Sequence, residues 1–126
     1  MHKWRVAIFG LGHWYSAYGL ARALRDYDGA ELVAVACRDL SQLKAFTERF
    51  GVPGYEHAEE LLRREHVDIV HLAAPVSELA QLTITAANAG KHLILGKPMA
   101  MTVAEADRMV DAVQPTGVTC FPFQGI

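Results

Sequence analysis

The sequence has 126 residues, of which 52% are hydrophobic and 21% charged, and its net charge is -2. This length and composition predict one compact soluble domain, and the interleaved charges lack the basic stripe that nucleic-acid binding requires. No stretch without Asp, Glu, Lys or Arg reaches the ~20 residues of a membrane helix. Cys37 and Cys120 lie far apart and outside any CxxC motif, so we expect neither a disulfide framework nor a zinc site. The same use of cysteine favours a cytoplasmic protein.

Apolar runs typical of strands alternate along the chain with segments typical of helices. In chain order, we expect a strand over Val6–Phe9, a helix over 13–27, a strand over Leu32–Ala36, a helix over 40–50, a short strand at Tyr55, a helix over Glu59–Arg64, a strand over Val67–Ala73, a helix from Ser77 to Gly90, a strand over Leu93–Leu95, a helix over 103–113 and a strand over Val118–Phe121.

Several residues mark the ends of these helices. Asp39 and Ser77 are good N-cap residues, and Thr102 and Glu105 have the spacing of a capping box. Gly90 is a typical residue just beyond a helix C-terminus.

Continuous apolar strands separated by helices predict a parallel sheet that is covered on both faces. Right-handed crossovers then give a doubly wound α/β fold of three layers (α/β/α), the Rossmann type, with strand order 3-2-1-4-5-6. We assign residues 1–121 to this domain, and residues 122–126 to a tail that would lead into a second domain, which is absent here.

The first predicted strand runs into a glycine turn. Gly10 and Gly12 match the first two positions of G-x-G-x-x-G, the turn that brings a dinucleotide pyrophosphate against a helix N-terminus. Tyr15 occupies the third position, so the motif is incomplete, and the two glycines could simply form a turn. Their place between a strand and a helix favours cofactor binding, with His13 and Trp14 bordering the pyrophosphate or nicotinamide.

The end of the second strand bears on which dinucleotide is bound. Cys37 stands where an NAD site usually has an acidic residue, and Arg38 could pair with a 2′-phosphate. This arrangement favours NADP over NAD. In the alternative, Arg38 is solvated, and Asp39 either caps a helix or turns to the ribose.

Lys97 follows the predicted strand Leu93–Leu95, at the edge of the sheet that Gly10 and Gly12 also occupy. It is not the lysine of a P-loop, because the upstream glycine is misplaced and Pro98 follows it. A lysine at this edge could hydrogen-bond a reacting hydroxyl and move its proton as hydride leaves the carbon. In the alternative, it is a solvated lysine in a turn.

Four stretches together resemble the N-terminal domain of the glucose-fructose oxidoreductase and inositol dehydrogenase family: "GLGHWYSAYGLARAL", "ELVAVACRD", "VDIVHLAAPVSELAQLTITAANAGKHLILGKPMAMTVAEADRMV" and "GVTCF". The resemblance implies NAD(P)-dependent hydride transfer on sugars, cyclitols or similar polyols. It also implies that Lys97 is catalytic and contacts the cofactor, that Pro98 fixes its turn, and that Ala74 and Pro75 line the cofactor.

The sequence departs from the family pattern at several positions. Gly96 replaces the glutamate before the lysine, Tyr18 matches a frequent histidine, and the Thr-Pro-x-x-x-His stretch has Ala74 and Leu79 at its ends. The family also continues into a second domain that supplies most substrate contacts, so we expect a partner chain or a homo-oligomer, which the apolar tail could promote. One alternative is a nucleotide-binding module without turnover, and another is a structural domain that has lost cofactor binding, which Tyr15 would suggest.

Two further groups are interpreted as structural. His71 lies inside a predicted strand and is expected to be a hydrogen-bonded core residue. Glu56, His57, Glu59 and Glu60 have no established ligand spacing and are expected to form a solvated helix start rather than a metal site.

Overall fold

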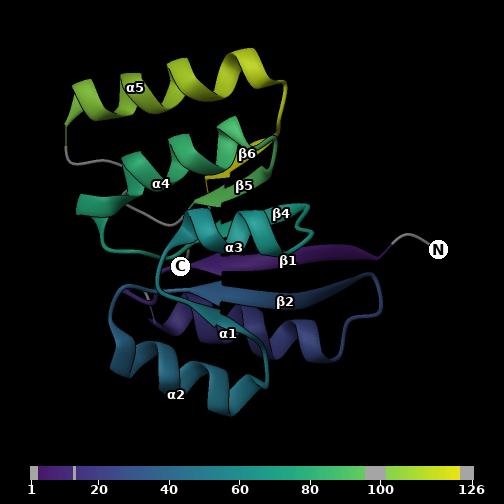
Figure 1. Ribbon diagram of the computed structural model, residues 1–126. Helices are drawn as coiled ribbons and strands as arrows, with labels where there is room; N and C mark the ends of the chain where they lie inside the picture. The colour runs from purple at the N-terminus through teal and green to yellow at the C-terminus, as the bar shows by residue number, and fades with distance from the viewer. Residues whose placement is uncertain (1–2, 13, 96–101, 123–126) are drawn as a thin grey trace.

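A computed structural model describes residues 3–12, 14–95 and 102–122 of the protein. Strands and helices alternate through these residues as the sequence predicts (Figure 1). The elements are β1 (Trp4–Phe9), α1 (Trp14–Arg25), β2 (Ala30–Ala36), α2 (Leu40–Phe50), β3 (Gly54–Tyr55), α3 (Ala58–Arg64), β4 (Ile69–Leu72), α4 (Val76–Asn88), β5 (His92–Leu95), α5 (Val103–Val113), the 3₁₀ turn η1 (Gln114–Thr116) and β6 (Cys120–Pro122).

Within the described residues, the sheet has six strands in the order β3-β2-β1-β4-β5-β6, and every neighbouring pair is parallel. The predicted strand order is therefore confirmed. The chain runs outward from β1 to β3, returns to β4 on the other side of β1, and then runs outward to β6. This reversal creates a switch point between β1 and β4, where doubly wound folds bind their ligands.

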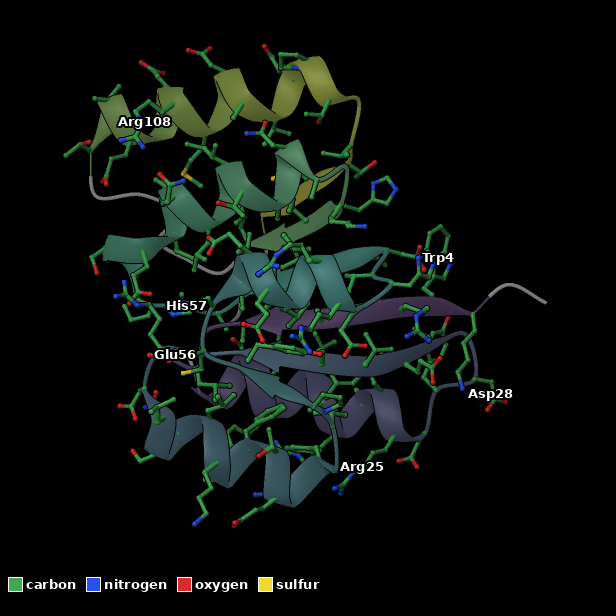
Figure 2. All side chains as sticks on the ribbon, in the orientation of Figure 1. Trp4, Arg25, Asp28, Glu56, His57 and Arg108 are labelled. Atoms are coloured by element: carbon green, nitrogen blue, oxygen red, sulfur yellow. The ribbon has the colours of Figure 1, made fainter. Side chains whose placement is uncertain are left out.

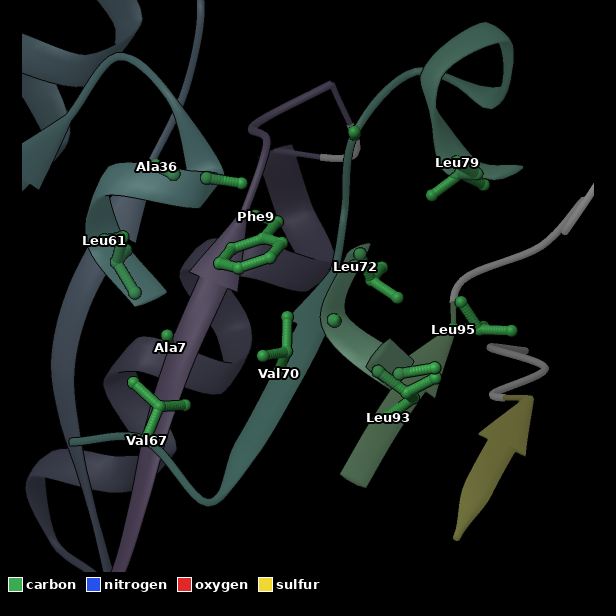
Figure 3. Packing of buried hydrophobic residues seen from close by; sticks show 14 of the residues in the cluster. Ala7, Phe9, Ala36, Leu61, Val67, Val70, Leu72, Leu79, Leu93 and Leu95 are labelled. Carbon is green, nitrogen blue, oxygen red and sulfur yellow. The ribbon is translucent and has the colours of Figure 1, made fainter. Parts of the chain in front are cut away.

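Two layers of helices bury the two faces of the sheet, as Figure 1 shows with α1 and α2 side by side on one side and α4 and α5 side by side on the other. Alternate residues of β1 serve the two cores. Phe9 belongs to one buried cluster with Leu61, Leu79 and Met109, whereas Ile8 belongs to a second cluster with Phe46. Figure 3 shows side chains from β1, β4 and β5 gathered in the first of these clusters. Burial on both faces explains why the strands are continuously apolar.

Helix ends follow the predicted signals at three positions. The Asp39 side chain accepts hydrogen bonds from the backbone N–H groups of Ser41 and Gln42, and that of Thr102 accepts one from Glu105 N. Gly90, with φ of +77°, follows the end of α4. In each case the governing interaction is local in sequence.

The predicted Ser77 cap is wrong. α4 begins one residue earlier, at Val76, and its N-cap is Pro75, which makes no side-chain capping bond. The proline has a φ of -55°, near the value that its ring imposes, so the chain turns into the helix without a side-chain cap, and Glu78 N donates to Pro75 O at 2.8 Å. Ser77 consequently lies inside the first turn.

The last predicted strand is shifted. The sequence predicts it over Val118–Phe121, whereas the structure has it over Cys120–Pro122. Thr119 already bonds to the sheet edge, because Leu93 N donates to its carbonyl, but its own N–H donates to Nδ1 of His92 at 3.0 Å. A side-chain acceptor thus replaces the first ladder bond.

Candidate functional site

Two turns meet at the C-terminal edge of the sheet, beside the switch point. Gly10 has a φ of +83°, and a Cβ added to it would lie 2.3 Å from the Cα of Ala74. A Cβ added to Gly12 would lie 2.8 Å from the Cδ of Pro75. The turn after β1 therefore packs directly on the turn after β4, and both glycines are required by this contact whether or not a ligand is present.

The same turn presents a helix N-terminus. Gly10 is buried and its N–H donates to the carbonyl of Ala36 at 2.6 Å, whereas Gly12 is exposed. α1 begins at Trp14, and its first turn carries no acidic side chain. The partial positive charge of this helix N-terminus is thus not neutralised by an acidic side chain within that turn, which suits an anionic ligand.

A cavity of about 300 Å³ opens beside this turn. Its lining comes from the ends of β1 and β2, from the turn that leads into α3, and from the first half of α4: Phe9, Gly10, Ala36, Cys37, Arg38, Glu56, His57, Ala58, Glu59, Ser77, Glu78, Gln81 and Leu82. Figure 2 shows Glu56 and His57 at the edge toward which the arrowheads of β1 and β2 point. The cavity thus lies at the edge where parallel α/β sheets bind ligands.

Charges of both signs line the cavity. Arg38 contributes a guanidinium, and carboxylates come from Glu56, Glu59 and Glu78. His57 lies with its Nε2 at 3.9 Å from an oxygen of Glu56. Arg38 can pair with a phosphate, while the carboxylates can accept hydrogen bonds from hydroxyl or amino groups.

Cys37 is buried at the end of β2, with its Sγ 3.8 Å from Oε1 of Gln42. Burial raises the pKa of its thiol, and the carboxylates of Asp39 and Glu78 raise it further, against backbone hydrogen bonds that lower it. The side chain is therefore neutral near pH 7 and places no charge against a phosphate.

Asp39 is engaged in capping α2. One carboxylate oxygen accepts from Ser41 Oγ at 2.7 Å, from Ser41 N at 3.1 Å and from Gln42 N at 3.2 Å. These hydrogen bonds lower the pKa of Asp39. Asp39 is not among the residues that line the cavity, so of the two roles left open for it, the structure shows the cap.

The structure brings together only part of the predicted site. Gly10, Cys37 and Arg38 line the cavity, while Ala74 and Pro75 lie against the two glycines. His13, the Trp14 side chain and Lys97 lie outside the described residues. The contribution of α4 to the cavity was not predicted, because nothing in the sequence distinguishes four of its residues from those of an ordinary helix: Ser77, Glu78, Gln81 and Leu82.

Other residues weighed in the sequence have structural surroundings. His71 is 3% exposed, and its Nε2 lies 3.3 Å from Ser16 Oγ, as expected of a hydrogen-bonded core histidine. Tyr18 packs edge-on against Phe46, with ring centroids 5.1 Å apart. Among the described residues, no group of three or more His, Cys, Asp or Glu side chains could hold a metal ion. No helix in those ranges is long and apolar enough to cross a bilayer.

Comparison with known proteins identifies the family. The family model described as an oxidoreductase family with an NAD-binding Rossmann fold matches residues 4–124. The chain therefore belongs to this oxidoreductase family, and the resemblance read from the sequence is confirmed. Among curated proteins it is similar to D-apiose dehydrogenase of Paraburkholderia graminis, with 37% identity over 117 residues, 92% of this chain and 31% of that protein.

Solved structures agree with this assignment. The WlbA dehydrogenase of Bordetella pertussis, in complex with NADH and UDP-GlcNAcA, matches with a TM-score of 0.87 and 29% identity over 97% of this chain and 37% of that one. Biliverdin reductase of Synechocystis, in complex with biliverdin and NADP+, matches with a TM-score of 0.84 and 25% identity over 94% and 37%. The chain thus spans about a third of the length of the relatives that it matches.

Proposed function

We propose that the chain is the NAD(P)-binding domain of an oxidoreductase that transfers hydride between a nicotinamide cofactor and a sugar, cyclitol or similar polyol. The observation that carries the proposal is the cavity beside Gly10, lined by Cys37 and Arg38 at the C-terminal edge of the sheet. Family membership and the sugar-related names of similar proteins support the reaction class.

Different residues of the site would contact different parts of the cofactor. Gly10, Gly12 and the N-terminus of α1 would hold the pyrophosphate, with His13 and Trp14 beside it. Ala74 and Pro75 would form a backbone wall along the cofactor. The bound nicotinamide supplies the hydride chemistry, while the protein aligns it with the substrate.

NADP is the preferred cofactor in this proposal. The neutral thiol of Cys37 leaves room for a 2′-phosphate, and the exposed guanidinium of Arg38 lines the same cavity. A charge-assisted pair between guanidinium and phosphate would strengthen NADP binding relative to NAD.

Lys97 would handle the proton. By sequence it follows β5 by two residues, and β5 ends at the same edge of the parallel sheet as β4 and β1. Its side chain would hydrogen-bond the substrate oxygen and, as the neutral amine, accept the hydroxyl proton as hydride leaves the carbon, which gives an ammonium group. Most substrate contacts would come from a second domain, supplied by further polypeptide, by a partner chain or through a homo-oligomer, and we expect the protein in the cytoplasm.

A titration of the purified chain with NADPH and with NADH tests the proposal, with quenching of the fluorescence of its two tryptophans as the signal. Saturable quenching by both nucleotides, tighter for NADPH, is the expected result. Absence of binding by either nucleotide would contradict the proposed function.

A binding module without turnover is the second candidate. It is favoured by Gly96, which stands where the family pattern has the glutamate that precedes its lysine. The two candidates are separated by incubating the protein with NADP+ and a panel of sugars and polyols and following absorbance at the NADPH maximum. Cofactor binding without turnover on any of them would favour the module.

A further inference from the structure

Glu78 lines the cavity from the first turn of α4, whereas Cys37 and Arg38 line it from the end of β2. It is the third residue of α4, its side chain is half-buried, and it lines the same cavity as Cys37 and Arg38. Its position is set by the backbone, because its N–H donates to the carbonyl of Pro75 at 2.8 Å, and Pro75 itself lies against the glycine turn. The start of α4 therefore places Glu78 in the wall of the cavity.

The field of this carboxylate reaches the end of β2. Burial is the main cause of the raised pKa of the Cys37 thiol, and the charge of Glu78 contributes to it. A ligand group placed beside Cys37 would experience the same negative charge.

The end of β2 supplies no carboxylate among the residues that line the cavity. Cys37 is a neutral thiol, and Asp39 is held by its three hydrogen bonds at the start of α2. Of the other acidic residues that line the cavity, Glu56 and Glu59 are exposed, and Glu56 faces His57. The half-buried acceptor available to a hydroxyl in this cavity is thus on α4.

We propose that Glu78 is a specificity-determining residue that accepts a hydrogen bond from the adenosine ribose of the bound cofactor and disfavours a 2′-phosphate in the same place. The inference rests on the proposed function. An ionised carboxylate is a strong acceptor for a hydroxyl, and its charge opposes a phosphate. Glu78 and Arg38 then act against each other, so that the chain binds NADP and still retains NAD.

The test is the substitution Glu78→Gln, with dissociation constants measured for NADH and for NADPH by isothermal titration calorimetry. Replacing a charged hydrogen-bond acceptor by a neutral amide oxygen should weaken NADH binding about tenfold. NADPH binding should become tighter, because a negative charge beside its phosphate is removed. Opposite effects on two ligands cannot arise from partial unfolding, which would weaken both.

Two further variants sharpen the test. Glu60→Gln removes the same charge from α3, at a residue that does not line the cavity and that lies 3.7 Å from Arg64, and it should change the ratio of the two constants less than twofold. Glu78→Asp keeps the charge on a shorter side chain, so it should weaken NADH binding but leave NADPH binding as in the unsubstituted chain.

The outcomes separate the inference from the proposed function. If the unsubstituted chain binds both nucleotides but Glu78→Gln changes the two constants by the same factor, or Glu60→Gln shifts their ratio as much, the role of Glu78 is refuted and the cofactor site stands. If the unsubstituted chain binds neither nucleotide, the proposed function fails, and the inference fails with it.

Discussion

Replacing Gly10 by alanine tests the contact between the two turns on which the site is built. At φ of +83° a side chain costs about 1–2 kcal/mol of backbone strain. The new Cβ would lie 2.3 Å from Cα of Ala74, a backbone atom that cannot move aside, and overpacking of this kind adds about 1–3 kcal/mol. We expect Gly10→Ala to lower the free energy of unfolding by about 2–5 kcal/mol, a large fraction of the stability of a small domain.

Two other glycines separate these causes. A Cβ at Gly90 would meet no atom within 4 Å, but φ is +77°, so Gly90→Ala should cost only the strain of about 1–2 kcal/mol. Gly19 lies inside α1 with the same open space and no positive φ, so Gly19→Ala should stabilise the protein by about 1 kcal/mol.

Urea unfolding followed by circular dichroism measures all three variants under the same conditions. If Gly10→Ala costs no more than Gly90→Ala, the turn after β1 does not pack on Ala74 as described, and the argument for a preformed site at this edge is refuted.

Three further predictions concern the cofactor site and its surroundings. Arg38→Gln should weaken NADPH binding about tenfold or more and NADH binding less than threefold, because it removes the cation that pairs with the 2′-phosphate. Cys37→Asp should weaken NADPH binding more than NADH binding, because it places a negative charge beside the same phosphate. Equal effects of either change on the two nucleotides in the same titration would contradict this. Because the pKa of Asp39 is lowered by folding, its contribution to stability is present above the unfolded pKa of about 3.9 and is lost as the pH falls through the lower folded value. Asp39→Ala should therefore lower the thermal midpoint at pH 7 and differ less from the unsubstituted protein at pH 3, and a constant difference would argue against the cap. If the chain turns over a polyol with NADP+, Lys97→Met should abolish turnover and weaken NADPH binding far less, whereas turnover that persists would refute the catalytic role of Lys97.

The structural features that the sequence predicted correctly are those whose physical cause lies within a few neighbouring residues. Apolar runs bounded by glycine and by capping residues identify the strands and helices, since burial on two faces and the free N–H groups of a helix start impose their patterns within a few residues. Asp39 and Thr102 are caps as predicted. Ser77 is not, because Pro75 starts the same helix earlier by its fixed φ.

The composition of the site depended on contacts between distant segments. The sequence alone determined the alternating elements, the strand order, the glycine turn and the neutral residue at the end of β2. Only the tertiary structure decided that Gly10 and Gly12 pack on Ala74 and Pro75, and that Glu78 shares a cavity with Cys37 and Arg38. These contacts arise because the chain adds strands on one side of β1 up to β3 and then on the other side from β4 onward. The spacing of residues along the chain does not predict which side chains this change of side brings together.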